Sequence, residues 1–172
     1  YVGVDEDGVI KLDELKAAIR PTTIMISVMF ANNEIGTIQP IKEIGEIAKE
    51  HDIIFHTDAV QAYGHVPINV DEYHIDMLSA SGHKINGPKG IGIMYLRNSV
   101  KIGPFIHGGA QERNRRAGTH NVPGIVGFGK ATEIAKETMA ERSAYETKLR
   151  DRLIEGLTAI PNSRLNGHRT NR

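Results

Sequence analysis

Cysteine is absent from the 172 residues of this chain, and its absence excludes several kinds of chemistry. A disulfide framework, a cysteine-ligated zinc or iron–sulfur site and a thiol nucleophile all require this residue. The absence is compatible with a reducing compartment. We expect a cytoplasmic protein of bacterial type, with an organelle matrix as the alternative.

The chain also lacks an excess of charge of either sign and a long hydrophobic run. Its 21 Lys and Arg residues balance its 21 Asp and Glu residues, whereas a nucleic-acid-binding protein needs a basic excess to displace counterions. No stretch approaches the roughly 18 consecutive apolar residues of a membrane-spanning helix. We therefore expect no nucleic-acid partner and no membrane partner.

Neither end of the sequence has the features of a natural terminus. The first residues lack an initiator methionine and a signal-peptide core, and the last residues are a polar run without a closing element. We expect the chain to be an internal piece of a longer protein.

Apolar, strand-like runs alternate with helical periodicity along the chain. The runs that predict strands are 23–30, 53–57, 76–80 and 91–96, and helical patterns cover 12–19, 41–48 and 123–157. Strand–helix–strand order with short connections predicts an α/β fold with a mainly parallel mixed sheet and flanking helices. The connection at 87–90 is too short for a crossover helix, so we expect the last strand to be antiparallel. Lys42 and Glu46 are expected to pair on the second helix.

Polar clusters follow three of the expected strands, where ligands bind in open α/β sheets. They are Asn32-Asn33-Glu34, Asp58 with Gln61, and Ser81-Gly82-His83-Lys84. A carboxylate, a lysine able to form a Schiff base, and hydroxyl and imidazole groups for a phosphate are together what pyridoxal phosphate requires. Taken singly, Asp58 could cap a helix and Lys84 could be a solvated charge. Their joint placement favours the cofactor.

Two segments, 56–61 and 79–92, closely resemble the cysteine desulfurases, which are pyridoxal-phosphate enzymes of the class V aminotransferase superfamily with the fold type I architecture. Further matching motifs lie at 32–36, 107–113 and 116–119. The resemblance extends from about Val4 to Asn166. It implies that residues 1–140 are part of the cofactor-binding large domain, and that 141–172 form a helical linker and the start of the small domain.

The resemblance also implies roles for residues around the cofactor ring. Lys84 resembles the catalytic lysine, which binds the cofactor covalently and later moves the substrate proton. Asp58 resembles the partner of the ring nitrogen, and Gln61 the donor to the phenolic oxygen. Asn33 resembles the residue near that oxygen and the substrate carboxylate.

The remaining implied roles concern the cofactor phosphate. Ser81 and His83 resemble its ligands within one subunit. Thr119, in the Arg-Ala-Gly-Thr motif, resembles a residue that reaches the phosphate in the partner subunit. This last match implies a homodimer with shared active sites.

The family reaction converts L-cysteine to L-alanine and passes the sulfur to an enzyme cysteine, for iron–sulfur cluster assembly or thiolation through a scaffold or sulfur-acceptor protein. This chain lacks that cysteine. The family's ring-stacking histidine, phosphate-binding threonine and carboxylate-binding arginine cannot be placed in it either. We therefore expect the chain alone not to turn over cysteine.

Several other interpretations stay open at this point. Other class V aminotransferases and selenocysteine lyases share the lysine and the aspartate. A two-His-one-carboxylate iron site could use His56 and Asp58 with a distant His107 or His120. A non-enzymatic scaffold built on a decayed enzyme is a third class, and the intact lysine and carboxylate argue against it. An EF-hand-like pattern at 3–14 is excluded, because its first ligand position is Gly3 and no helix precedes it; a strand or turn leading into the helix at 12–19 is expected instead.

Overall fold

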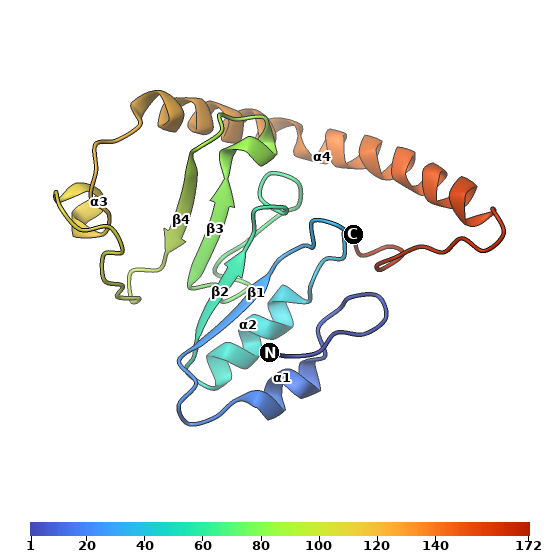
Figure 1. The fold of residues 1–172 in the computed structure, drawn as a ribbon, viewed down its shortest axis with the longest axis horizontal. Helices are drawn as coiled ribbons and strands as arrows, with labels where there is room; N and C mark the ends of the chain where they lie inside the picture. Colours follow the sequence, from blue (N-terminus) through green and yellow to red (C-terminus); the bar gives the residue numbers. More distant parts are fainter.

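The computed structural model describes residues 1–172 as an α/β fold around one four-stranded sheet (Figure 1). The strands are β1 (Met25–Met29), β2 (Ile54–Asp58), β3 (Met77–Ser81) and β4 (Gly92–Leu96). The helices are α1 (Leu12–Ala18), α2 (Ile41–Glu50), α3 (Gln111–Asn114) and α4 (Val122–Thr158), and a 3₁₀ turn, η1 (Gly82–Ile85), follows β3. Every strand and helix expected from the sequence is present, and α3 is additional.

The sheet has the order β1-β2-β3-β4, in which the first three strands are parallel and β4 is antiparallel to β3. This arrangement confirms the predicted mixed, mainly parallel sheet. In the register, Asp58 pairs with Met29 on one side and with Ser79 on the other. The carboxyl ends of β1, β2 and β3 therefore meet at one edge of the sheet.

The main hydrophobic core lies between one face of the sheet and the helices α1 and α2. Alternate strand residues point into it, among them Ile26, Phe55 and Leu78, and the apolar side of α2 covers them. Gly45 of α2 lies against the backbone of Tyr73, and a Cβ atom at this position would lie 1.9 Å from the Tyr73 carbonyl oxygen. The glycine thus lets the segment before β3 cross the helix closely.

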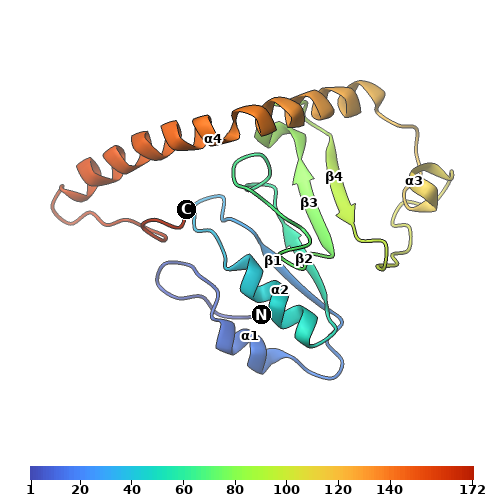
Figure 2. The same cartoon turned by 180° about the vertical axis from the view of Figure 1, so that it is seen from behind.

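The long helix α4 crosses the edge where β3 ends and then extends beyond the sheet, as the front and back views both show (Figures 1 and 2). Its first half packs on η1 through a second core of Ile85, Phe128, Ala131 and Ala135. The domain boundary expected at residue 140 falls within this continuous helix and stays a prediction. No helix in the structure combines the length and the apolar character needed to cross a membrane.

The expected ion pair between Lys42 and Glu46 does not form. Lys42 contacts Glu72 at 3.5 Å instead of Glu46. The segment that crosses α2 near Gly45 brings Glu72 to the helix, and the sequence spacing within the helix does not reveal this neighbour.

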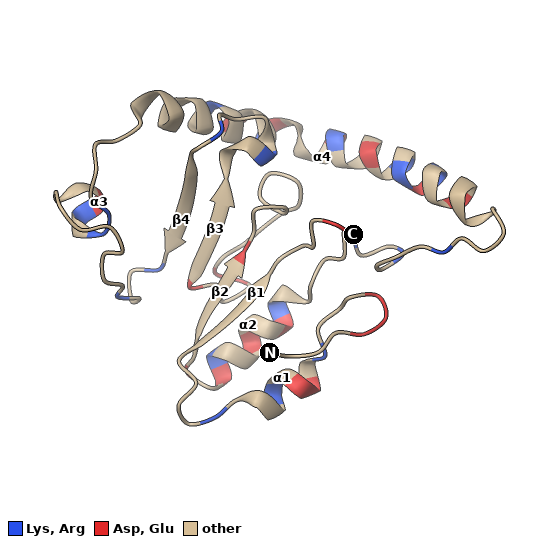
Figure 3. Ribbon diagram, viewed as in Figure 1, with Lys and Arg blue, Asp and Glu red and all other residues tan.

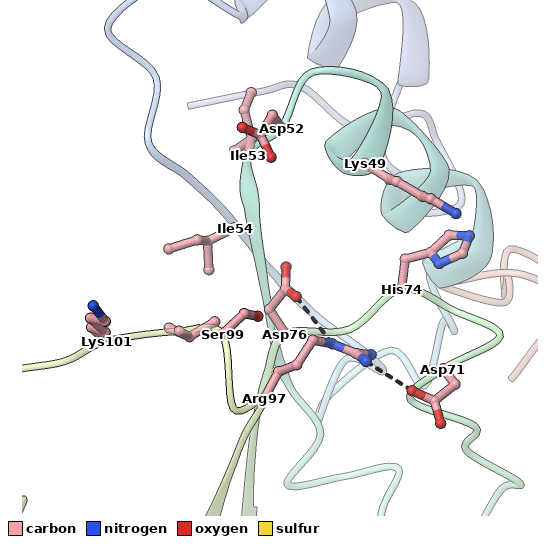
Figure 4. A pocket seen from close by; sticks show the side chains of 11 residues that line it. Lys49, Asp52, Ile53, Ile54, Asp71, His74, Asp76, Arg97, Ser99 and Lys101 are labelled. Carbon is pink, nitrogen blue, oxygen red and sulfur yellow. Dashed lines mark hydrogen bonds and ion pairs between the residues drawn. The ribbon is translucent and has the colours of Figure 1, made fainter.

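Arg97 lies at the edge of the sheet opposite to the carboxyl ends of β1, β2 and β3. Its guanidinium contacts Asp71 at 2.8 Å and Asp76 at 3.2 Å (Figure 4). It also donates to the carbonyl oxygens of Val70 and Ile75 at 2.9 Å each. Asp76 in turn accepts a hydrogen bond from the backbone N–H of Phe55. A hollow of about 420 Å³ lies beside this cluster. The charged groups of Arg97, Asp71 and Asp76 connect β2, β3 and the end of β4.

Replacing Arg97 with methionine is expected to lower the free energy of unfolding by about 2–3 kcal/mol, because the change removes the guanidinium hydrogen bonds to the Val70 and Ile75 carbonyl oxygens and leaves the half-buried Asp76 carboxylate without its cation. Urea denaturation measures the change. Arg164→Met is the matched control, since Arg164 is exposed and makes no side-chain hydrogen bond or ion pair. Equal stability of the two variants would contradict the role of Arg97.

Candidate active site

Asp58 is the only charged residue within the four strands. Figure 3 shows that most of the charged residues lie on helices and connections. The Oδ1 of Asp58 accepts a hydrogen bond from the N–H of Val60 at 2.9 Å, and Oδ2 has no partner within the chain. No named helix begins at this residue, but the bond to Val60 caps the turn at 59–66, so one carboxylate oxygen has the capping role. Asp58 offers one free carboxylate oxygen at the edge where ligands bind in such sheets.

Lys84 lies in η1, directly after the carboxyl end of the neighbouring strand β3. The side chain is half-buried, and its Nζ makes no hydrogen bond or ion pair within the chain. Just before it, Ser81 Oγ and His83 Nδ1 are 2.7 Å apart, so a hydroxyl and an imidazole are held together. The turn thus presents a free amine beside two groups that can bind a phosphate.

Asn33 and Gln61 follow the ends of β1 and β2, and both line a cleft of about 530 Å³ between this edge and α4. Neither side-chain amide makes a hydrogen bond within the chain. Asp58, Ser81 and Lys84 lie outside the lining of this cleft. The two amides therefore belong to a cleft whose lining contains no residue of the lysine turn.

Thr119 is exposed, in the segment that leads into α4, and its side chain makes no hydrogen bond within the chain. The structure does not bring it to the other predicted site residues. Its implied place in a partner subunit's site stays a prediction.

The donor set fits pyridoxal phosphate. The chain provides one unpaired amine, one carboxylate with a free oxygen, and a hydroxyl–imidazole pair at the ends of adjacent parallel strands. An amine can bind an aldehyde, a carboxylate can hold a protonated ring nitrogen, and hydroxyl and imidazole groups can hold a phosphate. Lys84 would bind the aldehyde, Asp58 the ring nitrogen, and Ser81 with His83 the phosphate.

The metal-site alternative finds no support in the geometry. No group of three His, Asp or Glu residues in the chain lies close enough to hold a metal ion. Both ring nitrogens of His56 face hydroxyl groups, and His120 pairs with Glu112 at 3.0 Å.

Sequence reasoning placed His56 in a motif and missed its contacts. On the face opposite to the main core, its Nδ1 lies 2.8 Å from Ser27 Oγ and its Nε2 lies 2.9 Å from Ser79 Oγ. The imidazole thus links three strands beside Asp58, which is on the same face two residues along. Alternation along β2 predicts this shared face, but the contacts across strands require the register.

Burial lowers the pKa of His56 below its ordinary value, and the negative charge of Asp58 opposes part of this shift. A histidine of lowered pKa binds fewer protons in the folded state than in the unfolded chain. The free energy of unfolding should therefore decrease as the pH falls below about 6.5.

The His56→Gln variant should lose less stability than the original chain between about pH 7.5 and pH 5.5, because it removes this group from the titration. Urea denaturation across this range measures the difference, with exposed His51→Gln as the control. An unchanged pH dependence in His56→Gln would show that His56 does not titrate as described.

Comparison with known proteins gives a consistent result. The sequence model of the aminotransferase class-V family matches residues 1–172. Cysteine desulfurase IscS of Methanosarcina thermophila is 66% identical over 172 residues, which are 100% of this chain and 43% of that protein. The chain thus spans less than half the length of this curated relative.

Solved structures agree with the sequence comparison. A NifS-like protein superimposes with a TM-score of 0.89 at 47% identity, covering 92% of this chain and 44% of its own. SspA, solved in complex with cysteine, matches with a TM-score of 0.73 at 47% identity, over 82% of this chain and 43% of its own. With a family match over its whole length, the chain belongs to the aminotransferase class-V family.

Proposed function

We propose that this chain is the lysine-bearing part of a pyridoxal-phosphate-dependent cysteine desulfurase. The observation that carries the proposal is that the free amine of Lys84 and the free carboxylate oxygen of Asp58 both follow the ends of neighbouring parallel strands. The 66% identity to the Methanosarcina thermophila desulfurase supports the choice of this reaction within the family.

Pyridoxal phosphate, when bound, supplies an aldehyde for amines and an electron-withdrawing ring. Lys84 Nζ binds that aldehyde and later accepts and returns the proton of the substrate. Asp58 keeps a proton on the ring nitrogen. Ser81 and His83 hold the phosphate.

Two amide side chains complete the proposed site. Gln61 donates to the phenolic oxygen of the cofactor, and Asn33 orients the substrate carboxylate. Both line the cleft beside α4, which is open to a small ligand. Lys84 lies outside the lining of this cleft, so the cleft supports the placement of the two amides and not a position for the substrate.

The proposed substrate is L-cysteine, which is converted to L-alanine, while the sulfur passes to an enzyme cysteine outside this chain. The complex of the related SspA protein with cysteine supports this choice. An iron–sulfur scaffold or another sulfur-acceptor protein is the proposed partner, and Thr119 acts across a homodimer. A cytoplasmic location stays a prediction.

Alanine release from L-cysteine tests the proposal in two proteins. The first is the chain itself, which we expect to be inactive because it contains no cysteine to accept the sulfur. The second is a chimera in which residues 1–172 replace the matched segment of the Methanosarcina thermophila protein, and we expect this chimera to release alanine. Release by the chain alone would overturn the first expectation.

The same assay separates the family alternatives. A selenocysteine lyase would release alanine from L-selenocysteine and not from L-cysteine, and an aminotransferase would form a keto acid instead. A folded chimera that releases no alanine from L-cysteine would contradict the proposed function. Far-UV circular dichroism of the chimera shows whether it is folded.

A further inference from the structure

The lysine turn η1 is tied to the rest of the fold by residues 62–66. His65 Nε2 lies 3.0 Å from the carbonyl oxygen of Lys84. The carbonyl oxygen of His65 accepts a hydrogen bond from Ser143 Oγ of α4 at 2.8 Å, and the neighbouring Gly64 carbonyl accepts one from Arg142. A continuous path of contacts therefore joins the Lys84 backbone to α4.

Close packing holds this connection in place. Gly64 has a positive φ of +76°, and a Cβ atom there would lie 2.7 Å from Ile85 Cγ2 and 3.2 Å from Ala135 Cβ. Tyr63 packs edge-on against Phe128, and its hydroxyl lies 3.3 Å from Thr132 Oγ1. The segment, the lysine turn and α4 thus meet at one buried junction.

The hydrogen bond from His65 gives the Lys84 carbonyl oxygen a donor that the turn itself does not provide. Within a 3₁₀ turn, a carbonyl bonds the N–H three residues later. For Lys84 that residue is Gly87, whose N–H instead bonds the carbonyl of Gly82 at 2.9 Å. A carbonyl oxygen only accepts, so the Nε2 of His65 carries the proton and donates it.

We propose that His65 is a positioning residue for Lys84, holding the backbone of the lysine turn by donation to the Lys84 carbonyl so that the amine points toward the strand ends. This role rests on the proposed function, in which Lys84 is the catalytic amine. His65 itself need not touch substrate or cofactor. His65 acts by increasing the fraction of molecules in which the Lys84 amine points toward the strand ends.

Two substitutions whose side chains have equal length separate the effect of the N–H donor from the effect of side-chain size. His65→Gln keeps an N–H donor near the position of Nε2, whereas His65→Met has the same chain length and no donor. Each protein is mixed with pyridoxal phosphate and reduced with borohydride, and the labelled peptides are quantified by mass spectrometry. The unlabelled form of the same peptide normalises the label on Lys84, and His51→Met is the control for losing an exposed histidine.

We expect the initial rate of Lys84 labelling to fall about two- to tenfold in His65→Met, the factor that one net hydrogen bond contributes. It should stay within about twofold of the original chain in His65→Gln. Backbone amide exchange in the peptide 81–90 should rise by a similar factor only in His65→Met. Equal labelling in the two variants, whether both normal or both slow, would overturn the proposal because the donor would then make no difference.

Failure of the proposed function would look different. In that case the original chain, folded by circular dichroism, would show no preference for Lys84 over its other lysines. Amide exchange would still decide whether His65 braces the turn, since it requires no cofactor. Unchanged exchange in His65→Met would overturn the bracing role by itself.

Discussion

Substitution of Lys84 by arginine is expected to reduce alanine release by the chimera at least about 10³-fold, because the guanidinium stays protonated and can neither bind an aldehyde nor take a proton from the substrate. Lys84 is suited to both tasks, since it is half-buried and its amine has no partner in the chain. Positive charge and approximate length are retained, so the fold should be unaffected. Steady-state assay of alanine release measures the effect.

Lys89→Arg is the matched control for this substitution. Lys89 is exposed and follows the same turn, and we expect activity within about twofold of the unsubstituted chimera because a surface change of this kind perturbs little. If Lys84→Arg kept a tenth or more of the activity, another group would have to be the catalytic amine.

Asp58→Asn is the second substitution with a large expected effect. The amide is nearly isosteric, but it removes the only charge in the sheet. Removing one preorganised electrostatic group from a catalytic site typically costs about 10²–10³ in rate, and we expect a loss of this size in the chimera. The affinity for pyridoxal phosphate, measured by fluorescence titration, should also fall.

The control for this change is Asp52→Asn, at the opposite end of β2. Asp52 is exposed and its side chain makes no hydrogen bond. If the two variants showed equal activity and equal cofactor affinity, Asp58 would not be the partner of the ring nitrogen.

The sheet could be predicted from the sequence because each strand is short, apolar and bounded by turn residues. The run at 23–30 contains β1, and the glycine-rich connection at 87–90 correctly indicated an antiparallel β4. Such signals are local. The pairing of Lys42 with Glu72 is not local, since it depends on a segment 30 residues away.

Some residues of the candidate site could likewise be predicted from local sequence signals, and others could not. Asp58 and Lys84 could be predicted because they interrupt or directly follow apolar strands, and these strands proved to be neighbours. His65 could not, because its partner is a backbone carbonyl, which any residue type supplies. The bonds of His56 to Ser27 and Ser79 depend on the register of three strands, which the sequence pattern does not specify.

One lysine of the chain, Lys84, is proposed to bind pyridoxal phosphate. The most direct test is to mix the chain with pyridoxal phosphate, reduce with borohydride and map the label by mass spectrometry, with a circular dichroism spectrum of the same sample. Of the ten lysines in the chain, we expect Lys84 alone to carry substantial label. Label scattered over the exposed lysines of a folded sample would contradict the account.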